Sequence, residues 1–245
     1  MDPLAHKYPS TGSYVYCLGN PIKYIDPDGR STHTNQSGKV IAVYDDKNLG
    51  VYRHSDKSLK GFDPSKGNLS TKGAERMGES LHALSFADQT LYNKTGEVKY
   101  KENMTIDFGS SELTSKVNGI LGAKPSLIDY FKKAGSNGDW DIKSKVNNGS
   151  LLYGKYASPR DAGNFAAGAV AQMSGFEPIA QFGYGAYNLT GNSKSLTGLM
   201  TIGVGILTYT NSSIGLSAAG LISKFGEDKL SQRSIDLGKQ YIINK

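Results

Sequence analysis

Turn-forming residues dominate residues 1–30 of this chain. Prolines and glycines recur there at short intervals, in Asp2-Pro3, Tyr8-Pro9, Gly19-Asn20-Pro21 and Asp26-Pro27-Asp28-Gly29. Because proline ends helices and Asp-Gly pairs favour turns, no long helix fits this segment. The runs between the turns are aromatic or β-branched, and they predict short strands at Tyr14-Val15-Tyr16 and Ile22-Lys23-Tyr24-Ile25.

Residues 31–68 predict a linker that contains a short β-hairpin. Residues 31–38 are polar, and residues 39–54 place two β-rich runs around Asp46-Lys47-Asn48. Two such runs joined by turn-forming residues are typical of a hairpin, in which the two strands pair with each other.

The spacing of the apolar residues changes from Ser70 onward. Met77, Leu81 and Leu84 recur at helical intervals, so we expect a helix over residues 70–89. Residues 136–150 have the composition of a loop and contain the only tryptophan, Trp140.

Further helices are predicted from local start and stop signals. Ser111 is a candidate cap for residues 110–122, and residues 124–135 form a short helix that ends at Gly135. The pair Ser158-Pro159 is typical of a cap and a first turn, and it opens a helix rich in small residues.

The last segment, residues 226–244, predicts an amphipathic terminal helix. These patterns together predict an α+β fold with a predominantly α-helical region preceded by a short β-hairpin segment. We expect three parts: residues 1–30, residues 31–68 and residues 69–245.

Composition excludes several classes of protein. The single Cys17 excludes a disulfide framework and a cysteine-based zinc site. The formal net charge of +6 is mild and forms no basic tail, so it permits a nucleic-acid substrate without arguing for one. Asp2 and Pro3 follow Met1 with no apolar run behind them, so we expect no signal peptide.

The segment "DPLAHKYPSTGSYVYCLGNPIKYIDPDGR", residues 2–30, resembles the end of the core of Rhs-repeat proteins. Tyr-x-Tyr, Asn-Pro and a terminal Asp-Pro-x-Gly recur in that family. Its repeats build a β-shell, and a variable toxin follows the last motif. The resemblance implies that residues 1–30 are a remnant of the core and that residues 31–245 are a toxin cargo.

A second resemblance covers residues 100–245. The motifs "GDWDIKS" (138–144), "RDAGNFAAGA" (160–169) and "GEDKLSQRSIDLGKQYI" (226–242) are similar to the polymorphic-toxin type 44 domain. A nuclease role is the usual expectation for such toxins. The resemblance therefore implies a mainly helical toxin domain that cleaves RNA or DNA.

The two resemblances also imply a biological setting. We expect an effector that acts against competing bacteria and is blocked by a cognate immunity protein. Its other partners would be the Rhs core shell and a secretion apparatus. The protein would be made in the cytoplasm and delivered into a target bacterium without a signal peptide, by a type VI-like route.

Six residues in the matching motifs can do the chemistry of a nuclease: Asp141, Lys143, Asp161, Asn164, Glu227 and Asp228. In an extended segment, Asp141 and Lys143 would lie on one face, because side chains alternate along a strand. On a helix, Asp161 and Asn164 would share a face. Carboxylates from separate segments can hold Mg²⁺ or another divalent cation, and we expect Asp141 and Asp161 as ligands, with no organic cofactor.

Structural roles compete with these assignments. Asp161, Glu227 and Asp228 lie in first turns of predicted helices, where acidic residues offset the helix dipole. Trp140 favours a core position, and Asp141 and Lys143 can be an exposed ion pair.

The four histidines are His6, His33, His54 and His82, and all precede the second matching segment. A mechanism with two histidines as acid and base cannot be built from residues 83–245. His82 is expected to be a partly buried residue on the helix predicted over residues 70–89.

Two other activities stay open. A peptidoglycan glycosidase would use paired carboxylates, Asp141 with Asp161 or Glu177. A pore-forming toxin would use the apolar residues 196–222, which make membrane contact in that case. Each apolar run there is shorter than the roughly 20 residues that span a bilayer, which favours a buried helical pair instead.

Overall fold

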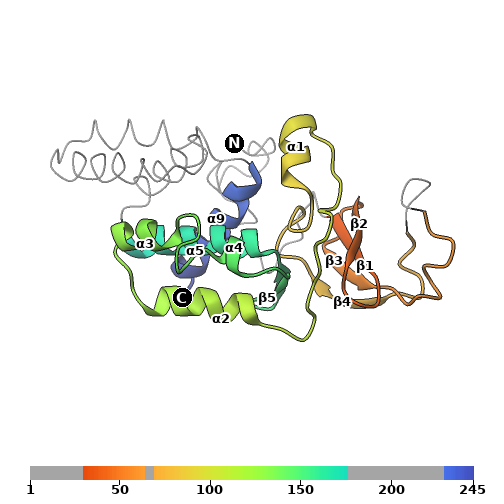
Figure 1. Cartoon of the computed structure of the whole chain (residues 1–245), viewed down its shortest axis with the longest axis horizontal. Helices are drawn as coiled ribbons and strands as arrows, with labels where there is room; N and C mark the ends of the chain where they lie inside the picture. The colour runs from red at the N-terminus through yellow and green to blue at the C-terminus, as the bar shows by residue number, and fades with distance from the viewer. Residues whose placement is uncertain (1–29, 64–68, 176–228) are drawn as a thin grey trace, which may run out of the picture. The chain divides into compact units, whose positions relative to one another are not determined.

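The structure is a computed structural model that describes residues 30–63, 69–175 and 229–245 (Figure 1). Its contacts divide the chain into two compact units, Met1–Asn103 and Met104–Lys245. Both strands and helices are present, so the predicted α+β class is confirmed at that level. The strands predicted before Arg30 lie outside the described residues.

Unit 1 is built on a four-stranded sheet in the order β2-β1-β3-β4. The strands are β1 Arg30–Thr34, β2 Val40–Asp45, β3 Gly50–Arg53 and β4 Glu75–Glu79. Strand β1 pairs antiparallel with β2 and parallel with β3, and β3 pairs antiparallel with β4.

The predicted hairpin of residues 39–54 is wrong in its pairing. Its two runs are strands β2 and β3, but β1 lies between them in the sheet. The polar residues 31–38 are likewise not a linker, because Ser31 to Thr34 are fully buried in the central strand. Polar residues can fill such a strand because they bond to one another, and that pairing is invisible in the local sequence.

The helix predicted over residues 70–89 is also wrong. Residues 75–79 form β4 instead, and the segment that follows consists of turns until α1 begins, Gln89–Thr95. Gly73 and Gly78 disfavour a helix here, and pairing with β3 outweighs the apolar spacing. His82 is buried as expected, but it lies in these turns rather than on a helix.

Unit 2 contains the helices that the sequence predicts from capping signals. They are α2 Glu112–Gly122, α3 Leu127–Ala134, α5 Pro159–Ser174 and α9 Lys229–Ile243. Ser126 caps α3, and Ser158 caps α5, each by accepting a hydrogen bond from a backbone N–H in the first turn.

Two elements of unit 2 are short. Helix α4 covers Ile142–Lys145, and β5 Ser150–Leu152 pairs antiparallel with β6 Lys155–Ala157. The hairpin turn consists of Tyr153 and Gly154, both with positive φ, at 49° and 87°. Positive φ at both central residues is typical of a type I′ turn, whose twist matches that of the strands.

Helix α5 is the core of unit 2, because α2, α3, α4 and α9 all pack against it (Figure 1). Helix α9 crosses α5, and Arg160 contacts Ser231 while Asp161 contacts Ser234. The two backbones approach closely at Gly168 and Gly238. A Cβ atom at Gly168 would overlap the Ile235 carbonyl, and one at Gly238 would overlap the Phe165 carbonyl.

Candidate functional site

Asp141 lies at the start of α4 and is 9% exposed. Its Oδ2 atom accepts hydrogen bonds from the Asn137 N–H, at 2.9 Å, and from Ser144 Oγ, at 2.8 Å. These bonds fix the turn between α3 and α4. Among the described residues, no hydrogen bond to Oδ1 is formed, so this oxygen is available to accept a proton or a ligand.

The extended segment expected for Asp141 and Lys143 is wrong, because Asp141 occupies the N-cap position of α4, without a side-chain capping bond, and Lys143 lies within this helix. Residues two apart on a helix do not share a face. The structure nevertheless brings Lys143 to α5 by another route. Its aliphatic chain packs against Gly163, where a Cβ would crowd Lys143 Cγ and Cε, while the residue as a whole stays exposed.

Tyr130 connects Asp141 to the same point on α5. It is 3% exposed, and its hydroxyl donates to the Gly163 carbonyl at 3.4 Å. Burial, and then the nearby Asp141 carboxylate, raise the pKa of Tyr130, so the phenol stays protonated. Tyr130 from α3 and Lys143 from α4 therefore both contact α5 at Gly163, and Asp141 lies near Tyr130.

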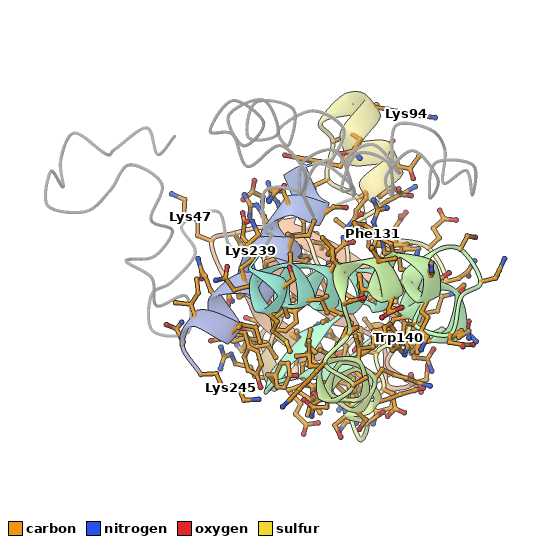
Figure 2. All side chains as sticks on the ribbon, turned by 90° about the vertical axis from the view of Figure 1, so that its left-hand side faces the viewer. Lys47, Lys94, Phe131, Trp140, Lys239 and Lys245 are labelled. Atoms are coloured by element: carbon orange, nitrogen blue, oxygen red, sulfur yellow. The ribbon has the colours of Figure 1, made fainter. Side chains whose placement is uncertain are left out.

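Trp140 lies next to this meeting point and is partly exposed (Figure 2). Its ring is 6.2 Å from that of Tyr130, and the Lys133 ammonium lies 4.6 Å from its ring centre. Trp140 thus packs at the edge of the core, with a cation–π contact on its outer side.

Asn164 follows Gly163 on α5 and is 5% exposed. Its Nδ2 group is buried and has no hydrogen-bond partner among the residues that the structure describes. An unpaired buried amide costs free energy, and a bound water, ion or ligand is one explanation for it. Asn164 stays a predicted site residue.

Asp161 has a structural role. It is fully buried, and its Oδ2 atom accepts from the Ser158 N–H, at 3.0 Å, and from Ser158 Oγ, at 2.8 Å. Its Oδ1 atom accepts from Ser234 Oγ at 3.1 Å. The carboxylate thus closes a capping box on α5 and joins this helix to α9.

This placement bears on the cation site. Both oxygens of Asp161 accept hydrogen bonds from serine groups, so this carboxylate is poorly suited to bind a cation. The described residues contain no group of three histidine, cysteine, aspartate or glutamate side chains that could hold a metal. Glu227 and Asp228 lie outside the described residues. A site for Mg²⁺ or another divalent cation stays a prediction, and of the two predicted ligands only Asp141 has an oxygen that accepts no hydrogen bond among the described residues.

The same placement bears on the other activities. A glycosidase that used Asp141 with Asp161 would need an accessible second carboxylate, and Glu177 lies outside the described residues. The apolar residues 196–222 also lie outside them. Among the helices that the structure does describe, none is long and apolar enough to cross a membrane.

Unit 1 contains a cluster that the sequence analysis missed. Ser31, His33 and His54 are buried to 1% exposure or less, and they form a hydrogen-bonded chain with Asp46 that we name the histidine relay. Burial first, and then the neighbouring His54, lower the pKa of His33 to about 4, although Asp46 opposes this. Burial also lowers the pKa of His54.

No local signal could have revealed this cluster. His33 lies on β1 and His54 directly follows β3, and they meet only because these two strands pair in parallel. The alternation in "STHT" is compatible with a strand, but it does not identify the partner of each side chain.

Comparison with family models, with curated proteins and with solved structures finds no match to this chain. The resemblances to Rhs-repeat proteins and to the type 44 toxin domain therefore remain predictions. The geometry of unit 2 is the remaining basis for a functional argument.

Proposed function

We propose that this chain carries the toxin of an Rhs-type polymorphic system, with a mainly helical effector region, and that the toxin is a nuclease. The observation that supports the activity is the packing of Lys143 on Gly163, together with Tyr130, which bonds to the Gly163 carbonyl and lies near enough to Asp141 for that carboxylate to raise its pKa. We infer that Lys143 and the Asp141 oxygen without a hydrogen bond act on the same substrate.

The roles follow from the chemistry of phosphodiester cleavage. The Lys143 ammonium pairs with a phosphate oxygen and stabilises the negative charge that develops in the transition state. Asp141 Oδ1 accepts a proton from the attacking water as a general base. The Asn164 amide supplies a further donor beside Gly163.

The proposal includes the biological partners that the sequence implies. The effector is delivered into a target bacterium and is neutralised there by a cognate immunity protein. RNA or DNA of the target cell is the substrate. Lys132 and Lys133 of α3 and Lys143 of α4 supply the positive charge that attracts such a polymer, whereas Lys145 pairs with Asp139.

Expression of the full chain in bacteria, directed to the cytoplasm or to the periplasm, tests the activity. We expect growth arrest from the cytoplasm together with degraded RNA or DNA. Lys143→Gln should reduce cleavage by the purified protein about 100-fold or more, because a charge that stabilises the transition state is lost. Lys145→Gln is the matched control on the same helix, and it should cleave normally.

Three results separate the alternatives. Equal cleavage by both lysine variants would contradict the assigned site. Toxicity from the periplasm alone, with intact nucleic acids, would contradict the nuclease. Loss of cleavage in EDTA that Mg²⁺ restores would support the predicted cation, whereas cleavage in EDTA would contradict the cation and leave the nuclease standing.

A further inference from the structure

The histidine relay connects three segments of unit 1. Asp46 Oδ2 lies 2.6 Å from Ser31 Oγ, which lies 3.0 Å from His33 Nε2. His33 Nδ1 lies 2.8 Å from Nε2 of His54. The relay thus runs from the exposed turn after β2, through the central strand β1, to the residue that follows β3.

The direction of each hydrogen bond follows from the carboxylate at its start. Ionised Asp46 can only accept, so the Ser31 hydroxyl donates to it and in turn accepts from His33 Nε2–H. Burial lowers the pKa of both histidines, so we take both rings as neutral at pH 7. A neutral His33 with its proton on Nε2 has a lone pair on Nδ1, which accepts from His54 Nε2–H.

The far end of the relay is open. His54 Nδ1 carries a lone pair in this arrangement, and it is buried without a hydrogen-bond partner among the described residues. A proton on this atom would create a buried cation whose new N–H has no acceptor. Such a group is costly in a protein interior.

Among the described residues, Asp46 is the one charge that offsets part of that cost, and burial outweighs it. The aromatic rings of Tyr44 and Tyr52 lie 5.1 and 5.4 Å from the His33 ring. Asp46 is exposed to solvent and reaches the rings only through Ser31. The other charged side chains on these strands pair with each other at the surface, in Arg30–Asp45 and Arg53–Glu75.

We propose that the histidine relay is an acid-sensitive latch, which holds β1 between β2 and β3 at neutral pH and releases this sheet when the histidine pair takes up a proton. The hydrogen bond from the His54 N–H to the Thr34 carbonyl, at 3.0 Å, would be among those that open. The inference concerns unit 1 and does not rest on the proposed nuclease.

The sign and size of the effect follow from linkage. Because the folded-state pKa of His33 lies below its ordinary value of 6.5, the open state binds more protons, and closure weakens as pH falls from 6.5 toward 4. Between pH 7 and pH 5 this one group shifts the equilibrium toward opening by about 25-fold.

Hydrogen exchange of the full chain at pH 7 and pH 5, corrected for the intrinsic exchange rates, measures this opening. We expect amides of β1 and β3 to exchange about 20- to 30-fold faster at pH 5. Amides of α5 and α9 should not change. An acceleration shared by both units, or by neither, would overturn the latch.

Two variants identify the responsible group. In His54→Gln, the amide can turn its oxygen to accept from protonated His33, so the acceleration should fall below about fivefold. His82→Gln removes another buried histidine of unit 1, outside the relay, and should behave as the native chain does. The opposite ranking of these two variants would assign the effect to His82.

The native chain alone also gives a decisive result. Nitrogen-15 NMR should show both His33 and His54 protonated on Nε2 at pH 7 and still neutral at pH 5.5. A proton on Nδ1 of either ring at pH 7, or titration near 6.5, would overturn the proposal even if His54→Gln does not fold.

Discussion

Single residues of unit 2 have roles that their sequence position alone leaves open. Asp161 is suited both to a cation site and to the first turn of a helix. The structure assigns its two oxygens to Ser158 and to Ser234, so this carboxylate joins two helices. Asp141 uses only one oxygen in this way, which is why it is the better candidate for chemistry.

Gly168 and Gly238 are needed where α5 and α9 cross, because neither position has room for a side chain. We expect Gly168→Ala to destabilise the protein by about 2–4 kcal/mol, because the added methyl group overlaps the Ile235 carbonyl and forces the helices apart. Urea unfolding monitored by circular dichroism measures the change.

Gly119 on α2 provides the control for this substitution. A Cβ there would meet nothing within 4 Å. Gly119→Ala should therefore stabilise the protein by up to about 1 kcal/mol, through the better helix propensity of alanine. Equal effects of the two substitutions would show that the crossing is not tight.

At the scale of elements, the sequence predicted helices far better than strands. Helices α3 and α5 begin at serines that bond to their own first turns, and such signals lie within four residues. The sheet depends on contacts between distant segments. β1 inserts between β2 and β3. Local patterns could therefore predict neither this strand order nor the contact between His33 and His54.

For the candidate site, too, local motifs identified the residues, whereas contacts between distant segments determine their geometry. Asp141, Lys143 and Asn164 were predicted from their motifs, and their role in a site stays a prediction. Their geometry was not predictable, because Lys143 reaches Gly163 through the fold of the α3–α4 turn rather than by strand alternation.

The caps of α2 and α5 give a test at this scale. Ser158→Ala should cost about 1–2 kcal/mol of unfolding free energy, since Ser158 Oγ accepts from the Asp161 N–H and donates to its carboxylate. Ser111→Ala should cost no more than about 0.3 kcal/mol, because the Ser111 side chain makes no capping bond. Chemical denaturation of both variants checks the difference, and similar costs would contradict the capping box.

At the scale of the whole molecule, the chain consists of two units with separate cores. The division after Asn103 falls close to the start of the segment that resembles the type 44 domain. The elements that hold Asp141, Lys143 and Asn164 all belong to unit 2.

We therefore expect residues 104–245 to fold without unit 1. The fragment should show a helical circular-dichroism spectrum and a cooperative unfolding transition, because α2, α3, α4 and α9 pack on α5 within this unit. If the proposed nuclease activity is confirmed, the fragment should keep it. A spectrum without helix, or unfolding without cooperativity, would show that the two units depend on each other.

The close approach of α5 and α9 also makes Gly168 and Gly238 energetically coupled. Once a methyl group at one position has separated the helices, a methyl group at the other finds space, so the double alanine variant should cost less than the sum of the single variants. In related chains, a larger residue at one position should thus tend to accompany a larger residue at the other. Positions 168 and 238 would then covary among such chains.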